Sequence, residues 1–162
     1  MTRPAVASSA ALLDAVAARA RASGVFGAVV SGVGVAGPRL ECAAKESSAP
    51  AFYRLDTEAA GLRLSMVTPD RWLSESVESD LEHTGDHIEE LLADELIELG
   101  VDGVELKVDH YRSEDKLFTF SSPLPAALTG SPPDAERVCV LLLAYEACFR
   151  RLGDMAAGPG NG

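Results

Sequence analysis

Three glycines near the N-terminus have the spacing of a phosphate-binding turn. Gly32 to Gly37 reads G-x-G-x-x-G after a β-rich run, and Asp56 ends an extended run nineteen residues further on. In a dinucleotide site, such glycines bring the backbone close to a pyrophosphate at a helix N-terminus, and the acid binds the ribose hydroxyls. Here the helix would have to fit within residues 38–47, and Glu41 stands where a small residue should let the helix and the strand touch. The pattern therefore favours a hairpin bent by glycine over a nucleotide site.

Two histidines have the spacing of metal ligands on one helix face. His83 and His87 are four residues apart, and a neighbouring carboxylate could supply a third ligand. Gly85 lies between them, and a helix break at this glycine would separate the two imidazoles. Surface histidines at a helix junction are the favoured interpretation. A related hypothesis is a pH-sensitive patch, because nearby carboxylates favour protonated imidazole.

No motif of a nucleophilic enzyme is present in the sequence. G-x-S-x-G does not occur, and acid pairs such as Asp80 with Glu82 are expected by chance in so acidic a segment. We therefore assign no catalytic residue and no metal ligand, and we expect no cofactor. The alternative is an enzyme or small-ligand protein that uses the Gly32 to Gly37 turn for a nucleotide, or His83 and His87 for a divalent metal.

The charge of the chain is negative and concentrated in one segment. Of 162 residues, 25 are Asp or Glu and 14 are Lys or Arg, which gives a formal charge of −11. Residues 75–115 hold fifteen of the acids and only two bases, Lys107 and Arg112. Because this charge repels phosphate backbones and anionic lipids, we expect no nucleic-acid or membrane partner. The acidic segment is either a solvated face or a docking surface for a basic protein partner.

The acidic segment and the tryptophan before it supply the candidate partner-binding residues. Trp72 and Arg71 are aromatic and basic neighbours of the kind enriched at binding hot spots. A core tryptophan at the foot of a helix is the more common alternative. If the acids contact a basic partner, reversing their charge should weaken association in a salt-dependent way. The residues that we assign to partner binding are Trp72, Glu75, Glu78, Glu82, Glu89 and Glu90.

The cysteines and the N-terminus indicate a cytoplasmic protein. Three cysteines cannot all pair, and Cys139 and Cys148 on one helix would be about 13.5 Å apart, beyond the reach of a disulfide. They are typical of small buried side chains in a reducing compartment. The Ala-rich N-terminus contains Asp14, and arginines follow where a signal peptide would be neutral. No run of eighteen apolar residues occurs, so no membrane-spanning helix is expected.

The elements that must position these residues follow from the spacing of apolar side chains. Helical spacing predicts four helices, over residues 8–22, 69–84, 86–99 and 136–152. Strand-like runs cover residues 25–35, 39–45, 51–56, 61–67, 104–109 and 117–120. Thr68 and Asp86 are candidate caps of the two acidic helices. Residues 121–134 contain four prolines and predict a loop.

This order predicts an α+β domain with an antiparallel sheet of about five strands covered by helices. One helix comes first, then two or three strands, two acidic helices, two strands and a last helix, because strands occur in runs and do not alternate with helices. Residues 138–144 are apolar nearly all round, so the last helix should be buried on more than one side. We expect one domain over residues 1–152 and a disordered Gly-rich tail over residues 153–162.

The element order resembles that of the type III secretion chaperone-like fold, which includes the YbjN family of bacterial regulators. That pattern is a helix, three strands, a helical segment, two strands and a helix, and it would cover residues 8–152. The resemblance implies a small acidic dimer that binds polypeptide and carries out no catalysis. The element order is also similar to that of the roadblock or longin type of α+β module, a dimerising adaptor that has its middle helix after two strands.

Charge segregation without a convergent catalytic set predicts a non-enzymatic interaction module. We expect a cytoplasmic adaptor or chaperone-like regulator that forms a homodimer. In this interpretation the sheet and the last helix form the scaffold. The acidic helices then face a basic partner or solvent.

Overall fold

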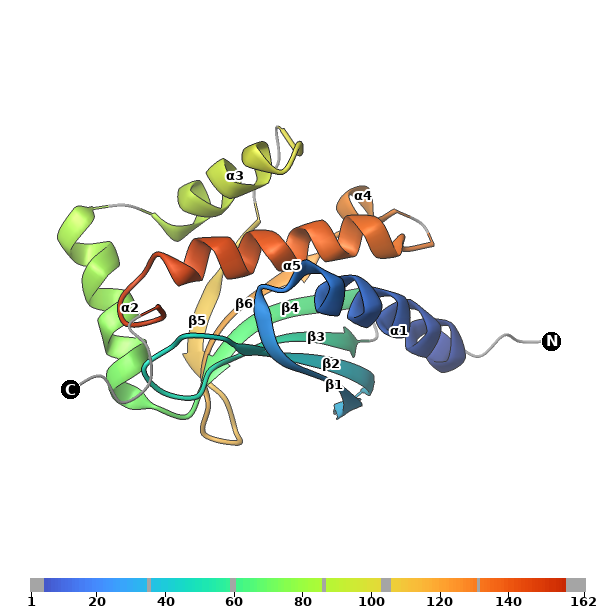
Figure 1. Ribbon diagram of the computed structural model, residues 1–162, viewed down its shortest axis with the longest axis horizontal. Coiled ribbons are helices and arrows are strands. Elements are labelled where there is room, and N and C mark those ends of the chain that lie inside the picture. The colour runs from blue at the N-terminus through green and yellow to red at the C-terminus, as the bar shows by residue number, and fades with distance from the viewer. Residues whose placement is uncertain are drawn as a thin grey trace.

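The fold is a six-stranded antiparallel sheet with helices packed against one of its faces (Figure 1). The computed structural model describes residues 5–34, 36–58, 61–85, 87–102, 106–130 and 132–156. The strand order across the sheet is β1-β2-β3-β4-β6-β5. Along the chain the elements are α1 (Ala5–Ser23), β1 (Phe26–Gly34), β2 (Gly37–Ala44), β3 (Phe52–Glu58), β4 (Gly61–Thr68), α2 (Arg71–Thr84), α3 (Ile88–Glu98), β5 (Asp109–Arg112), β6 (Phe118–Leu124), α4 (Ala126–Thr129) and α5 (Ala135–Arg150).

The predicted α+β class with an antiparallel sheet is confirmed. All five neighbouring strand pairs are antiparallel. Four strands precede the acidic helices, where two or three were predicted, so the sheet has six strands and not about five. The extra strand arises because residues 26–44 and residues 52–68 each fold into a complete hairpin.

The glycine-rich segment forms the turn of the first hairpin. Gly34 of β1 pairs with Gly37 of β2, and β2 then continues as a strand to Ala44. At Gly37 the φ angle is 144°, and a Cβ atom there would lie 2.7 Å from the Thr57 hydroxyl oxygen. Only glycine fits this close approach. The prediction of a glycine-bent hairpin is confirmed, and the strand-turn-helix arrangement of a dinucleotide site is not formed, because β2 follows the turn.

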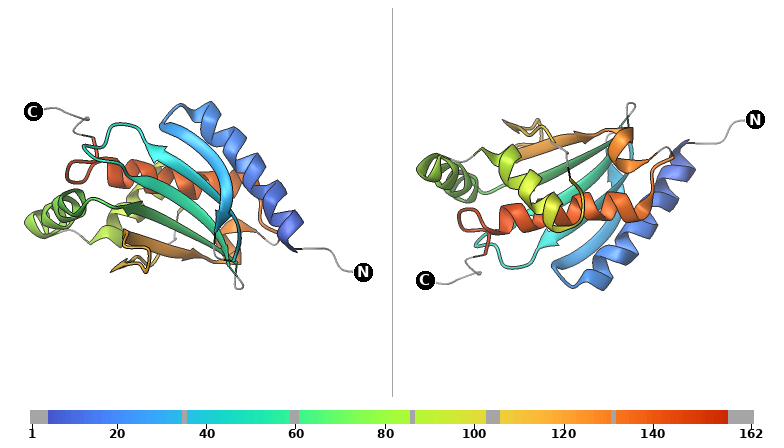
Figure 2. Two further views of the ribbon diagram at one scale, coloured as in Figure 1. Left: turned by 90° about the horizontal axis from the view of Figure 1, so that it is seen from below. Right: turned by 90° about the horizontal axis from the view of Figure 1, so that it is seen from above.

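Helices α1, α5 and α3 form two layers over one face of the sheet, and α2 lies at one end of the sheet (Figure 2). α1 covers β1 and β2, and α5 crosses β3 and β4. α3 packs on the side of α5 that faces away from the sheet, so α5 lies between the sheet and another helix. Burial of α5 on more than one side, predicted from its apolar sequence, is therefore confirmed. Among the described residues, no helix is both long enough and apolar enough to cross a bilayer.

The core lies between the sheet and α5. Tyr53 of β3 and Phe120 of β6 both contact Phe149 of α5, at ring-centroid distances of 6.5 and 5.2 Å. The Tyr145 hydroxyl of α5 is 2.5 Å from the Ser122 hydroxyl of β6, which gives both buried groups a hydrogen-bond partner. The hydrogen bond between Tyr145 and Ser122 and the aromatic contacts of Phe149 thus fix the position of α5 on the sheet.

All three cysteines are free and buried, as predicted. Cys42 lies on β2, and the other two lie on α5. Desolvation raises the pKa of the Cys42 thiol to about 12 and that of the Cys148 thiol to about 12. Desolvation also raises the pKa of Cys139. The thiols therefore act as small apolar side chains and are poor nucleophiles.

Two segments of the second half differ from their predicted structure. Leu106 and Val108 lie in irregular backbone, and the edge strand begins only at Asp109, so the predicted strand over residues 104–109 is wrong for residues 106–108. Residues 103–105 lie outside the described residues. β6 continues to Leu124 and α4 follows, where residues 121–134 were predicted to be a loop. β6 tolerates its proline because Pro123 lies near the strand end.

Four residues of the predicted C-terminal tail pack against α2. The Gly153 amide donates to Asp80 Oδ2 at 2.8 Å, and the Asp154 amide donates to Ser76 Oγ at 3.0 Å. Met155 is 3% exposed and belongs to the core. The prediction of disorder is therefore wrong for residues 153–156. Residues 157–162 lie outside the described residues.

The caps of the acidic helices also differ from prediction. Asp70 is the N-cap of α2, and its Oδ1 accepts from the Leu73 amide at 2.8 Å. Thr68, the predicted cap, accepts from the Asp70 amide at 3.0 Å and so supports the cap from outside. His87 is at the N-cap position of α3. The other predicted cap, Asp86, lies outside the described residues.

Candidate functional site

Trp72 lies on the outward side of α2, where its side chain is 75% exposed. Glu75, Ser79 and Glu82 follow at helical spacing on the same side, and all three are exposed. The opposite side of α2 buries Leu73 and other residues against the sheet. The core alternative for Trp72 is therefore wrong, and the indole stands in solvent among carboxylates. We call Trp72, Glu75, Ser79 and Glu82 the α2 outer face.

The carboxylates of the α2 outer face differ in their pairing. Glu75 forms an i,i+4 ion pair with Arg71, with an Nε–Oε2 distance of 3.0 Å. Both side chains are largely exposed, so this pair neutralises Glu75 only weakly. Glu82 has no ion pair within the described part of the chain, and neither does Glu90 of α3. These two carboxylates are the ones most available to an incoming cation.

Two of the predicted partner-binding residues turn toward the protein instead. Glu78 Oε2 lies 3.1 Å from His110 Nδ1 on β5. Glu89 is half-buried, and its Oε2 accepts from the Val108 amide at 3.2 Å. Both carboxylates therefore hold the segment around β5 against the acidic helices. Their contacts favour a structural role over partner binding.

The two acidic helices do not form one common surface. In Figure 1, α3 turns away from the end of α2 and runs over α5. The outward side of α3 carries Glu90, Asp94 and Glu98, together with the exposed side chain of Ile97. The candidate residues thus divide into the α2 outer face and a separate patch on α3. A single small partner could contact only part of the predicted set.

A serine, a histidine and a glutamate meet where α2 contacts β5. His110 Nδ1 is 3.1 Å from Glu78 Oε2, and its Nε2 is 3.5 Å from Ser74 Oγ. The His110 ring also stacks on Phe120 at 3.8 Å. Desolvation lowers the pKa of His110, although Glu78 opposes this shift. A neutral imidazole that donates to Glu78 can then accept from Ser74 at Nε2.

This serine, histidine and glutamate are of the residue types that form a nucleophilic triad, but the serine hydroxyl is too buried for a substrate to reach it. Ser74 is 1% exposed, and its oxygen is at the outer limit of hydrogen-bond distance from His110. The three groups instead fasten the edge strand to α2. The sequence could not reveal them as a set because Ser74 and His110 are 36 residues apart.

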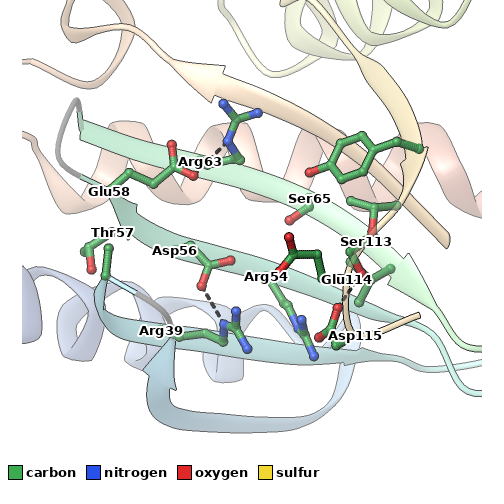
Figure 3. A pocket seen from close by; sticks show the side chains of 14 residues that line it. Arg39, Arg54, Asp56, Thr57, Glu58, Arg63, Ser65, Ser113, Glu114 and Asp115 are labelled. Atoms are coloured by element: carbon green, nitrogen blue, oxygen red, sulfur yellow. Dashed lines mark hydrogen bonds and ion pairs between the residues drawn. The ribbon is translucent and has the colours of Figure 1, made fainter. Parts of the chain in front are cut away.

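The sheet face opposite the helices carries a polar hollow of about 590 Å³ (Figure 3). Three arginines line it, and each is paired through Nε with a carboxylate. The pairs are Arg39 with Asp56 at 2.5 Å, Arg54 with Glu41 at 2.7 Å and Arg63 with Glu58 at 2.9 Å. All three pairs cross between neighbouring strands. The first two join directly opposite residues of β2 and β3, whereas Arg63 of β4 reaches diagonally to Glu58 of β3.

The turn between β5 and β6 adds acidic side chains to this hollow. Asp115 lies near the guanidinium groups of Arg39 and Arg54 (Figure 3). A hydrogen bond from Ser113 lowers the pKa of Asp115, and the two arginines add to this effect. With Glu114 also lining the hollow, its acids outnumber its arginines. The hollow therefore has no surplus positive charge with which to select an anion.

His83 and His87 do not share a helix face. His83 lies in the last turn of α2, His87 precedes α3, and Gly85 between them has φ 75°. The predicted helix break at this glycine is confirmed. In the described part of the chain, no group of three or more potential ligands is placed to hold a metal ion. The surface-histidine interpretation fits these positions.

Comparisons with known proteins do not assign this chain to a family. The chain matches no protein-family model, and the searches of curated proteins and of solved structures found no significant match.

Proposed function

We propose that this protein is an interaction module whose α2 outer face binds a basic segment of a partner protein. The observation that carries the proposal is the Trp72 indole, 75% exposed on the same side of α2 as the exposed carboxylates of Glu75 and Glu82. Tryptophan is enriched at the hot spots of protein interfaces. The residues named from sequence contribute unequally, with Glu78 and Glu89 engaged in internal contacts.

The chemistry of the α2 outer face suits a lysine- or arginine-rich amphipathic helix. A cation over the indole face gains a cation–π interaction, and the carboxylate of Glu75, one helical turn away, attracts the same cation. Glu82 lies about 15 Å from Trp72 along the helix axis and can attract a second cation of the same segment. Apolar residues of the partner can cover the rest of the indole and remove it from water. Because the carboxylates are exposed, added salt should weaken the association.

The resemblance in element order agrees with this role, since chaperone-like folds of the type III secretion class bind polypeptide. The present chain has one strand more before its helical pair than that pattern. Free buried thiols support a reducing, cytoplasmic compartment. The function proposed is thus recognition of a basic polypeptide by a non-enzymatic adaptor.

Fluorescence anisotropy of a labelled Lys/Leu amphipathic helical peptide tests the proposal. The Trp72→Ala variant should bind about tenfold more weakly, as expected for a hot-spot residue. The double reversal E75K/E82K should weaken binding further and reduce its dependence on salt. The matched control E114K/E136K makes the same charge change at exposed acids elsewhere and should have a smaller effect.

Intrinsic fluorescence gives a second readout, because Trp72 is the only tryptophan in the chain. Peptide binding at the α2 outer face should shift its emission to shorter wavelength as the indole leaves water. Binding without any change in Trp72 emission would contradict the proposal. Equal weakening by the two double reversals would also contradict it, since that result would indicate attraction by net charge alone.

A further inference from the structure

β1 is a long edge strand without a charged side chain. It pairs with β2 on one side only, and its nine residues contain no Asp, Glu, Lys or Arg. Val30 is 54% exposed and Val33 is 83% exposed. Natural edge strands are normally short, charged or covered, because free backbone groups at an edge pair readily with another strand. Apart from an irregularity between Phe26 and Val29 and a hydrogen bond from Arg21 of α1 to the Val29 carbonyl, β1 lacks these protections among the described residues.

The backbone groups that point away from β2 can be identified from the hairpin register. Gly34 and Gly37 flank the short turn, and Val33 is opposite Pro38. Because proline has no N–H, Val33 and Pro38 form a non-hydrogen-bonded pair, and the Val33 amide and carbonyl point outward. The orientation alternates along an antiparallel strand, so Ser31 and Val29 also point outward. Arg21 confirms this direction, since its Nη2 reaches the Val29 carbonyl at 2.9 Å.

The distribution of charge favours a second copy of the chain as the occupant of this edge. Residues 1–50 contain five bases and three acids, a net of +2, whereas residues 51–162 contain nine bases and twenty-two acids, a net of −13. The acidic helices pack at the β4, β5 and α5 side of the molecule, away from β1. Two copies can therefore meet at β1 without bringing their acidic segments together.

We infer that β1 pairs with β1 of a second copy, antiparallel and about a two-fold axis at Ser31. Ser31 of each copy then lies opposite Ser31 of the other, and Val29 lies opposite the second copy's Val33. In this register the outward amides and carbonyls face each other, and paired side chains lie on the same side of the sheet. The two six-stranded sheets become one continuous sheet, and the exposed Val33 is covered.

Charges on α1 are complementary in the same arrangement. Asp14 lines a hollow of about 280 Å³ beside Ser31 and Val33, whereas Arg21 contacts Val29 at the other end of the edge. A two-fold axis at Ser31 reverses the direction of the second α1. Asp14 of each copy then lies at the same end of the paired strands as Arg21 of the other copy. This symmetry brings opposite charges toward each other on the helix-covered face.

Light scattering and amide hydrogen exchange of the full chain test the pairing. The wild type should have twice the 17.0 kDa mass of one chain at high concentration. The Ser31→Pro variant removes an outward N–H and leaves the contacts with β2 in place, so it should be monomeric and folded. Val33→Lys places a charge at the interface and should give the same result. Ile97→Lys, which changes an exposed apolar residue on α3, should remain dimeric.

Hydrogen exchange separates edge pairing from other modes of association. In the wild type, the amides of Val29, Ser31 and Val33 should be protected at high concentration and lose that protection on dilution. A wild type that stays monomeric would overturn the inference, and so would a dimer in which these amides exchange freely. A dimer that Ile97→Lys dissociates while Val33→Lys does not would also overturn it. Protection of the β1 amides that appears only when a foreign peptide is added would also overturn the inference, because the occupant of the edge would then not be a second copy.

Discussion

The two edges of the sheet differ in length, charge and attachment. β5 has four residues, two of them charged, whereas β1 has nine residues and no charge. At β5, His110 stacks on Phe120 and pairs with Glu78 of α2. Tyr111 adds a hydroxyl contact to Ser121 at 3.3 Å. At β1, Arg21 is the side chain that bonds to the edge backbone.

This difference shows two ways in which one sheet can end. β5 is too short and too charged to pair with a further strand, and its side chains tie it to β6 and α2. On β1, which has no charged side chain, no side chain of the described residues bonds to the outward backbone groups of Ser31 and Val33. The contrast assigns different tasks to the two ends of the sheet: β5 closes the fold beside the acidic helices, and β1 remains open to another strand.

The largest expected effect is a loss of stability on removal of the Phe120 ring of β6, which stacks on His110 of β5. Phe120→Ala should lower the free energy of unfolding by about 3–5 kcal/mol, because Phe120 is buried and contacts both His110 and Phe149. Val30→Ala on β1 should change it by only about 0.5 kcal/mol, since that side chain is half exposed. Urea denaturation at low protein concentration measures both values. Similar losses of unfolding free energy in Phe120→Ala and Val30→Ala would contradict the contrast between the two ends of the sheet.

The pH dependence of stability should come from the β5 side. Burial lowers the pKa of His110 below its unfolded value of 6.5, so between those two pKa values the unfolded chain binds more protons than the folded chain. Stability should therefore be complete above about pH 6.5 and fall as the pH decreases through this window. His110→Gln should flatten the dependence, whereas His87→Gln, at an exposed site, should retain it. Urea midpoints between pH 5 and 8 test this; an unchanged slope in His110→Gln would contradict it.

The smallest expected effects concern ion pairs near the two edges. Glu41 lies on β2, next to β1, and Arg54 lies on β3; the Arg54 side chain is 15% exposed and the Glu41 side chain is 30% exposed. Their coupling energy should be about 1 kcal/mol in a double-mutant cycle, against about 0.3–0.5 kcal/mol for the more exposed Arg71 and Glu75 pair. Salt should reduce the second value more strongly. Equal coupling energies would show that partial burial on the open sheet face adds nothing.

Much of the secondary structure could be predicted because its signals are local. Leu73, Val77 and Leu81 recur at helical spacing, and Gly85 ends that helix with a positive φ. The glycine hairpin could be predicted because residues 38–47 leave little room for a helix after the turn and Glu41 stands where a small residue would be needed. The backbone structure around Leu106 was harder to predict, because alternating apolar residues also occur in irregular segments that bury a single side chain. The packed residues 153–156 could not be predicted, since their partners are on α2.

The candidate site was predictable in composition but not in arrangement. Trp72 and the acids near it were identified by residue type. Whether an amphipathic helix turns its tryptophan inward or outward depends on which side meets the sheet. Glu78 and Glu82 are one helical turn apart, yet one contacts His110 and the other faces solvent. Ser74 and His110 come together only when β5 lies beside α2.

The sequence by itself determined the α+β class, the negative charge and the glycine break between the acidic helices. These properties depend on residue type and on spacing within a few residues. The tertiary structure decided which strands form the edges, where α3 rests on α5 and which carboxylates remain free for a partner. Those outcomes arise from contacts between distant segments, whose energies appear only when the sheet and the helices pack together.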